Sequence, residues 1–154
     1  MRMQSVLLVC TANQCRSPMA MAILRSKVEH LPGEWRIESA GTWAIEGAPA
    51  NLKTQQVMTE LGLDIHDHRS RIVSHEMLPS FNLILVMEPG HKESLRIEFP
   101  EVANRVFLLS EMIGLNYTIM DPVGGDIEEY RATAQEINQI MTEGLGKIAD
   151  LAQA

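Results

Sequence analysis

Hydrophobic and polar residues alternate along the chain in blocks that predict strands and helices in turn. Four apolar or alternating segments predict strands at residues 6–9, 35–40, 83–87 and 105–109. Uninterrupted apolar runs, such as Leu83 to Met87, are typical of parallel strands that are buried on both faces.

Helices are predicted between these strands. Pro18 suits the first turn of a helix that runs to about His30, because its missing N–H costs nothing there. A second helix is predicted to begin at Pro49 and to stop at Gly62. Its inner face should carry Leu52, Val57, Met58 and Leu61. A short helix should follow Pro89.

The last helix has the clearest pattern. Asp126 and Glu129 form a capping-box-like start. Apolar residues then recur every three or four positions, at Ile127, Tyr130, Ala134, Ile137, Ile140, Met141, Leu145 and Ile148. Strands alternating with helices predict an α/β fold, a three-layer α/β/α sandwich around a four-stranded parallel sheet. The length of 154 residues suits one domain spanning 1–154.

Composition and charge exclude several classes of protein. The chain is 45% hydrophobic and 21% charged, which is ordinary for a globular protein, and its formal net charge is -7. Nucleic-acid binders are normally basic, so we expect no nucleic-acid partner. No apolar stretch approaches the roughly 20 residues of a membrane helix, and no signal peptide is visible. We therefore expect a cytoplasmic protein without a membrane partner.

The segment CTANQCRS, residues 10–17, carries the candidate chemistry at the predicted carboxyl end of the first strand, where ligands bind in such sheets. A loop between a buried strand and a helix can direct several backbone N–H groups at an anion. Arg16 can hold two phosphate oxygens, and the positive field should favour the thiolate of Cys10. Ser17 could donate a hydrogen bond to that thiolate, while Asn13 tolerates a left-handed backbone.

The loop also permits other interpretations. Cys10 alone is more often a small buried hydrophobe than a nucleophile. No Gly-Lys-Ser or Gly-Lys-Thr follows the loop, and the loop contains no glycine, so nucleotide-binding motifs are absent. The two cysteines cannot supply four zinc ligands, and His66 and His68 lack further partners. We expect neither a metal nor a cofactor.

The segment VCTANQCRSPMA closely resembles the phosphate-binding signature of the low-molecular-weight protein tyrosine phosphatases. Further blocks at residues 39–50, 61–71, 82–95 and 120–132 resemble the same family, so the similarity covers nearly the whole chain. The resemblance implies hydrolysis of phosphate monoesters, most simply of protein phosphotyrosine, through a phosphocysteine.

The resemblance also assigns roles to particular residues. Cys10 is the expected nucleophile, Arg16 binds the phosphate, and Asp121 of the Asp121-Pro122 pair is the expected proton donor. The rest of the loop is expected to bind substrate, namely Thr11, Ala12, Asn13, Gln14, Cys15 and Ser17. In the family, a cysteine at the position of Cys15 can form a disulfide with the nucleophile under oxidation.

This sequence departs from the family at positions that bear on the substrate. Gln14 fits neither the apolar residue of tyrosine phosphatases nor the threonine of the bacterial arginine phosphatases. Val123 stands where an aromatic residue commonly stacks on the substrate. Trp43 could supply that wall, and Tyr117 is a weaker candidate. Ala12 replaces a common glycine, so its backbone angles should be ordinary.

Several functions remain open from the sequence. A protein-arginine phosphatase of the same family and a non-catalytic phosphate-binding module are the alternatives to a tyrosine phosphatase. Thioredoxin-coupled arsenate reductases resemble this family but use further cysteines later in the chain; no cysteine follows Cys15, which argues strongly against the full reductase cycle. The expected partner is a phosphorylated protein or a small aryl phosphate, and the sequence leaves the oligomeric state open.

Overall fold

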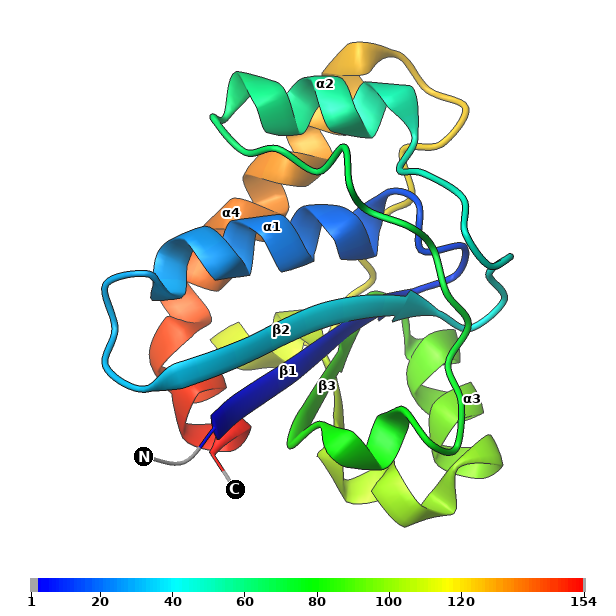
Figure 1. Cartoon of the computed structure of the whole chain (residues 1–154), viewed down its shortest axis with the longest axis vertical. Helices are drawn as coiled ribbons and strands as arrows, with labels where there is room; N and C mark the ends of the chain where they lie inside the picture. Colours follow the sequence, from blue (N-terminus) through cyan, green and yellow to red (C-terminus); the bar gives the residue numbers. More distant parts are fainter. Residues whose placement is uncertain (1–2, 154) are drawn as a thin grey trace.

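A four-stranded parallel sheet forms the centre of the computed structural model, which describes residues 3–153 (Figure 1). Its strands are β1 (Met3–Cys10), β2 (Glu34–Gly41), β3 (Leu83–Val86) and β4 (Val106–Leu108). They lie in the order β2-β1-β3-β4, and each neighbouring pair is parallel. The predicted four-stranded parallel sheet is confirmed.

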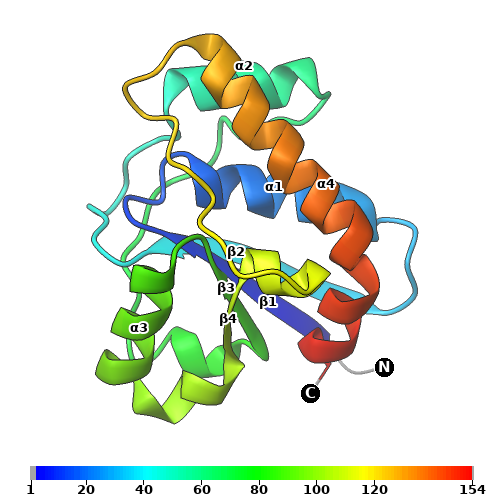
Figure 2. The same ribbon diagram turned by 180° about the vertical axis from the view of Figure 1, so that it is seen from behind.

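Helices cover both faces of this sheet, which gives the predicted three layers. Three helices lie on one side: α1 (Arg16–Val28), α2 (Leu52–Glu60) and α4 (Ile127–Ala152). The helix α3 (Pro89–Glu98) lies on the other side (Figure 2). Three 3-10 helices complete the fold: η1 (Leu78–Ser80), η2 (Pro100–Arg105) and η3 (Leu109–Ile113).

The alternation of side chains along β1 divides the core into two clusters. Val6 and Leu8 pack into the cluster beneath α1 and α4, whereas Leu7 and Val9 pack into the cluster that includes residues of α3. All four side chains are fully buried. Successive side chains of a strand point to opposite faces, so a strand covered by helices on both sides must be apolar throughout.

The helix boundaries differ in part from the prediction. The second helix begins at Leu52 rather than at Pro49, because Asn51 Oδ1 accepts a hydrogen bond from the Lys53 amide at 2.9 Å and caps it. The prediction of its inner face was also partly wrong, since Leu52 and Leu61 are 81% and 53% exposed. Val57 and Met58, however, are buried as predicted.

The two helices that flank the site in sequence agree more closely with the prediction. The first helix ends at Val28, slightly before the expected end near His30. In the last helix, Asp126 Oδ1 accepts a hydrogen bond from the Glu129 amide at 3.1 Å, which confirms the predicted cap.

The connections leave a crevice at one edge of the sheet. The chain leaves β1 and crosses through α1 to β2, whereas it leaves the neighbouring strand β3 and crosses through α3 to β4. The two crossovers lie on opposite faces (Figure 1), so the carboxyl ends of β1 and β3 are left uncovered between them. Cys10 is the last residue of β1 and lies at this edge.

Candidate active site

The loop from Cys10 to Ser17, called here the 10–17 loop, turns its carbonyl groups toward the surrounding structure. The carbonyl oxygens of Cys10 and Thr11 each accept a hydrogen bond at 2.9 Å from two consecutive amides that follow β2, and that of Gln14 accepts one from the Asn51 amide at 2.8 Å. No protein atom of the described chain accepts a hydrogen bond from the amides of residues 11–15. These N–H groups remain available to an anion.

Asn13 holds the loop in shape. Its φ is +58°, which confirms the left-handed backbone expected there, and its side chain is fully buried. Its Nδ2 donates to Ser17 Oγ at 2.8 Å and to Ser39 Oγ at 2.9 Å, while its Oδ1 accepts from the Arg71 amide at 3.0 Å. His68 Nε2 donates to its carbonyl oxygen at 2.7 Å.

Gly41, at the end of β2, also shapes the site, although no pattern in the sequence predicted this. A Cβ atom at this position would lie 2.4 Å from the carbonyl oxygen of Thr11 and 3.1 Å from the amide nitrogen of Asn13. Only a glycine therefore lets β2 approach the 10–17 loop this closely.

Cys10 and Ser17 meet inside the loop. Cys10 is only 3% exposed, and its Sγ lies 3.0 Å from Ser17 Oγ. Ser17 Oγ already accepts a hydrogen bond from Asn13, so its own proton is free to point at the sulfur. Within the part of the chain that the structure describes, the one other acceptor for this hydroxyl, the carbonyl oxygen of Ala40, is farther away at 3.4 Å. A hydroxyl donor at this place stabilises a thiolate.

Arg16 begins α1 and is buried, with a side chain only 2% exposed. Its Nη1 donates to the carbonyl oxygen of Ile119 at 2.7 Å and pairs with Glu88 Oε2 at 2.7 Å. Its Nη2 lies 3.7 Å from Asp121 Oδ2. A buried guanidinium needs such partners, since an unpaired buried charge is strongly destabilising.

Asp121 reaches the site from the segment before α4. Its Oδ1 accepts a hydrogen bond from the Val123 amide at 3.0 Å, while its Oδ2 faces Arg16. The Ile119 amide donates to the carbonyl oxygen of Met87 at 2.9 Å, which ties this segment to the end of β3. The carboxylate is 46% exposed and can reach a bound ligand.

Glu88 and His91 also lie at the site, and neither was predicted from the sequence. His91 is 7% exposed, and its Nε2 lies 2.8 Å from Thr11 Oγ1 and 3.8 Å from Glu88 Oε2. Burial lowers the pKa of His91, which favours the neutral ring. Both residues come shortly after the carboxyl end of β3, at the same edge of the sheet as Cys10, the last residue of β1, and this signal could have identified them.

The residues that were expected to border the substrate outside the 10–17 loop lie at the surface. Trp43 is 83% exposed and Val123 is 57% exposed. Ala12 is exposed and Gln14 is half-buried; neither has a positive φ, as was expected for Ala12. Tyr117 differs, because it packs partly against the core cluster beneath α4.

Cys15, five residues after Cys10, is free and buried. Burial raises the pKa of its thiol to about 12, so it stays protonated at neutral pH. A protonated thiol is a poor nucleophile, so Cys15 is not a candidate for the attacking group.

Residues 3–153 contain no group of three or more His, Cys, Asp or Glu side chains placed to hold a metal ion. In the same part of the chain, no helix has both the length and the apolar character to span a bilayer.

The chain is similar to known phosphatases along most of its length. It is 39% identical over 137 residues to a protein-arginine-phosphatase of Geobacillus stearothermophilus, covering 88% of this chain and 90% of the relative. It is 34% identical over 136 residues to a probable low molecular weight protein-tyrosine-phosphatase, EpsP, of Ralstonia nicotianae, covering 88% and 90%.

A solved structure has the same fold. The low molecular weight protein tyrosine phosphatase from T. tengcongensis superposes with a TM-score of 0.88 at 40% identity, covering 93% of this chain and 98% of that one. The family model described as low molecular weight phosphotyrosine protein phosphatase matches residues 5–153. This chain therefore belongs to the low molecular weight phosphotyrosine protein phosphatase family.

Proposed function

We propose that the chain hydrolyses phosphate monoesters, with protein phosphotyrosine as its main substrate, through a phosphocysteine intermediate. The observation that carries the proposal is that Cys10 and Asp121 both lie beside the anion-binding groups, which are Arg16 and the amides of the 10–17 loop. Cys10 Sγ lies 3.0 Å from a hydroxyl donor inside that loop, and Asp121 Oδ2 lies 3.7 Å from the Arg16 guanidinium.

In the first step, the Cys10 thiolate attacks phosphorus, so an S–P bond forms while the P–O bond to the leaving group breaks. Protonated Asp121 gives its proton to the departing oxygen. Arg16 and the loop amides bind the three equatorial oxygens, where negative charge is spread in the transition state.

In the second step, Asp121 accepts a proton from water as the water oxygen attacks phosphorus. The S–P bond breaks, and its electron pair returns to Cys10 as a thiolate. Inorganic phosphate leaves and the enzyme is restored, with no net oxidation or reduction. The neutral thiol of Cys15 and the buried hydroxyl of Ser17 take no part in bond breaking.

Hydrolysis of an aryl phosphate by the wild type and by Cys10→Ser tests this function. The wild type should turn over, and the variant should be inactive because the hydroxyl is a poor nucleophile here. A non-catalytic phosphate-binding module would bind the substrate without forming a phosphocysteine. Acid quenching within the first turnover separates these cases, because only the enzyme accumulates phosphate on Cys10.

A protein-arginine phosphatase is the second candidate. Two observations favour it: the relative at 39% identity carries that name, and Val123 provides no aromatic wall for a tyrosyl ring. Peptides of the same sequence carrying phosphotyrosine or phosphoarginine should be assayed in parallel. A higher kcat/KM for the phosphotyrosine peptide supports the main proposal, and the reverse supports the second candidate.

The proposed setting is the cytoplasm, with phosphorylated proteins as partners and without a nucleic-acid partner. The free thiols of Cys10 and Cys15 suit a reducing compartment. The net charge of -7 disfavours nucleic acid.

A further inference from the structure

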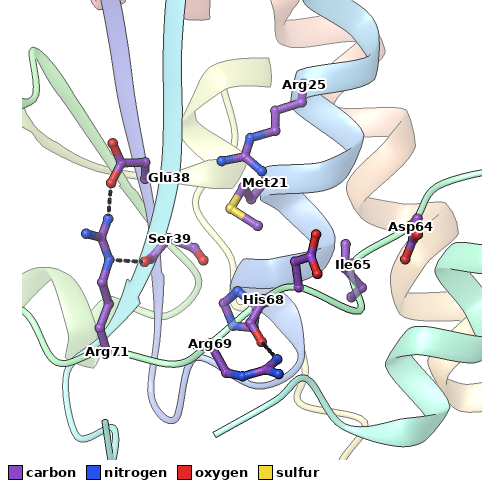
Figure 3. Close-up of a pocket in the computed structure, with 10 residues that line it drawn as sticks. Met21, Arg25, Glu38, Ser39, Asp64, Ile65, His68, Arg69 and Arg71 are labelled. Carbon is purple, nitrogen blue, oxygen red and sulfur yellow. Dashed lines mark hydrogen bonds and ion pairs between the residues drawn. The ribbon is translucent and has the colours of Figure 1, made fainter. Parts of the chain in front are cut away.

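A polar cavity with a volume of about 330 Å³ lies next to the 10–17 loop, between α1, β2 and the segment that follows α2. Figure 3 shows Arg25, His68, Arg69 and Arg71 arranged around it. Met21 is buried and contributes to its lining. The proposed function uses none of these side chains, so the cavity needs an explanation of its own.

Two of its guanidinium groups have no carboxylate partner. Arg25 donates Nε and Nη2 to the carbonyl oxygen of Ile37 at 2.9 and 2.6 Å, and Arg69 donates Nη1 to the carbonyl oxygens of His66 and His68. Within the described chain neither forms an ion pair, and Nη1 of Arg25 and both Nε and Nη2 of Arg69 make no hydrogen bond. The remaining N–H groups of both arginines are free to donate to an acceptor held in the cavity.

The carboxylates nearby are already engaged. Glu38 is shared between Arg36 and Arg71. Both Asp64 and Asp67 contact His66: Asp64 Oδ1 lies 2.6 Å from its Nδ1, and Asp67 Oδ1 lies 3.0 Å from its Nε2. The lining of the cavity thus holds three arginines against three carboxylates, and each of the carboxylates already has a basic partner other than Arg25 and Arg69. The guanidinium groups of Arg25 and Arg69 are therefore the charged groups of the lining that remain without an ionic partner in the described chain.

Arg25 also bears a cost that a bound anion would relieve. Partial desolvation lowers the pKa of its guanidinium, and the neighbouring Arg71 lowers it further. The charge of Glu38 raises the pKa of the Arg25 guanidinium, although the two side chains form no ion pair.

We propose that this cavity is a second oxyanion site, which binds a phosphate-type dianion between the guanidinium groups of Arg25 and Arg69. The planar forks of two arginines can each present paired N–H donors to such an anion. The site is separate from Cys10 and goes beyond the proposed hydrolysis.

The site is joined to the 10–17 loop through Asn13. Ser39, His68 and Arg71 line the cavity, and each is hydrogen-bonded to Asn13, at 2.9, 2.7 and 3.0 Å. An anion that moves these groups therefore acts on the residue that holds the left-handed turn of the loop. We infer that occupancy of the cavity is felt at the Asn13 side-chain amide.

Nuclear magnetic resonance on the full chain tests both parts of the proposal. The Nε–H of Arg25 is held on a carbonyl oxygen, which slows its exchange, and it serves as the reporter of binding. The active site is first filled with orthovanadate, and inorganic phosphate or methyl phosphate is then titrated at constant ionic strength. We expect saturable shifts of two signals, the Arg25 Nε–H and the Asn13 side-chain amide, and both should give the same Kd.

Matched variants identify the ligand groups. Arg69→Gln should weaken binding at the Arg25 reporter by about tenfold, because it removes a charged hydrogen-bond donor. Arg105→Gln is the control, since Arg105 likewise donates only to carbonyl oxygens, those of Pro79 and Phe81.

The two probes distinguish the sources of the anion. Equal affinities for inorganic phosphate and methyl phosphate point to free phosphate as the occupant, and tighter binding of methyl phosphate points to an organic phosphate.

Two results would overturn the site. One is a linear response that chloride reproduces, which would mean charge screening only. The other is equal affinity in wild type and Arg69→Gln. A saturable Arg25 shift without a change at Asn13 would overturn the coupling to the loop. Failure of vanadate to inhibit hydrolysis would count against the proposed function instead, since the Arg25 reporter reads this cavity directly.

Discussion

Glu88 Oε2 lies 2.7 Å from Nη1 of Arg16, and this guanidinium is only 2% exposed. The pair joins the end of β3 to the first residue of α1, across the crevice in which Cys10 lies. Glu88 thereby fixes the direction of the Arg16 fork before any ligand is bound. It also compensates a buried charge that would otherwise be costly.

We expect Glu88→Gln to lower the free energy of unfolding by about 1–3 kcal/mol, because the amide keeps the shape of the carboxylate but loses its charge. Urea denaturation measures the change. Glu93→Gln on the exposed face of α3 is the matched control and should be nearly neutral. Equal losses in the two variants would show that the contact with Arg16 contributes nothing.

This pair also shows what the sequence could not reveal. Cys10 and Arg16 were predictable because they lie within one short segment, between a strand and a helix that each have a local pattern. Glu88 comes from a distant part of the chain, and only the parallel pairing of β1 with β3 brings it to Arg16. The position of Glu88 after a predicted strand places it at the edge of the sheet, but no local pattern encodes its contact with Arg16.

The predicted start of the second helix was wrong for a related reason. A proline can begin a helix or precede one, and the pattern around Pro49 permits both. The hydrogen bond from the Lys53 amide to Asn51 decided the start. Leu52 and Leu61 are apolar but exposed, since packing against α1 and α4 uses only one face of this short helix.

Asp121→Asn should reduce kcat by a factor of about 10²–10⁴, because the amide cannot protonate the leaving oxygen. Inhibition by vanadate should change little, since the loop and Arg16 remain. Steady-state kinetics with an aryl phosphate measure both quantities, and Glu128→Gln in the first turn of α4 is the control. A normal kcat in Asp121→Asn would place the proton donor elsewhere.

Ser17→Ala should slow alkylation of Cys10 by iodoacetamide at neutral pH by roughly 10–100-fold. The hydroxyl lies 3.0 Å from the sulfur, and hydrogen bonds to charged groups are among the stronger ones. Mass spectrometry follows the labelling of each cysteine. Ser26→Ala, which removes a hydroxyl bonded to the Ile23 carbonyl in the same helix, should leave the rate unchanged. Equal slowing in both variants would argue against a role for Ser17.

His91 should make the protein less stable in mild acid. Burial lowers its pKa below the ordinary value of about 6.5, so in that interval the unfolded chain binds a proton that the folded chain does not. Stability from this residue is therefore present above about pH 6.5 and is lost as the pH falls toward the lowered pKa.

Urea denaturation at pH 7.5 and 5.5 measures the effect. His91→Gln, which can still bond to Thr11, should lose less stability than the wild type between these two pH values. His30→Gln at an exposed position should lose as much as the wild type. Parallel losses in wild type and His91→Gln would contradict burial of a neutral ring.

Val123→Tyr should shift substrate preference toward phosphotyrosine. Val123 is 57% exposed beside Asp121, and only its backbone amide bonds to that carboxylate, so a larger side chain leaves the contact intact. A stacked aromatic pair contributes about 0.5–1.5 kcal/mol, which corresponds to a decrease in KM of roughly 2–10-fold for a phosphotyrosine peptide. The phosphoarginine peptide of the same sequence should gain less, because its flexible side chain presents no ring to stack. Val123→Leu separates stacking from bulk: if it lowers the KM for phosphotyrosine as much as Val123→Tyr does, the gain comes from apolar contact and not from the aromatic face.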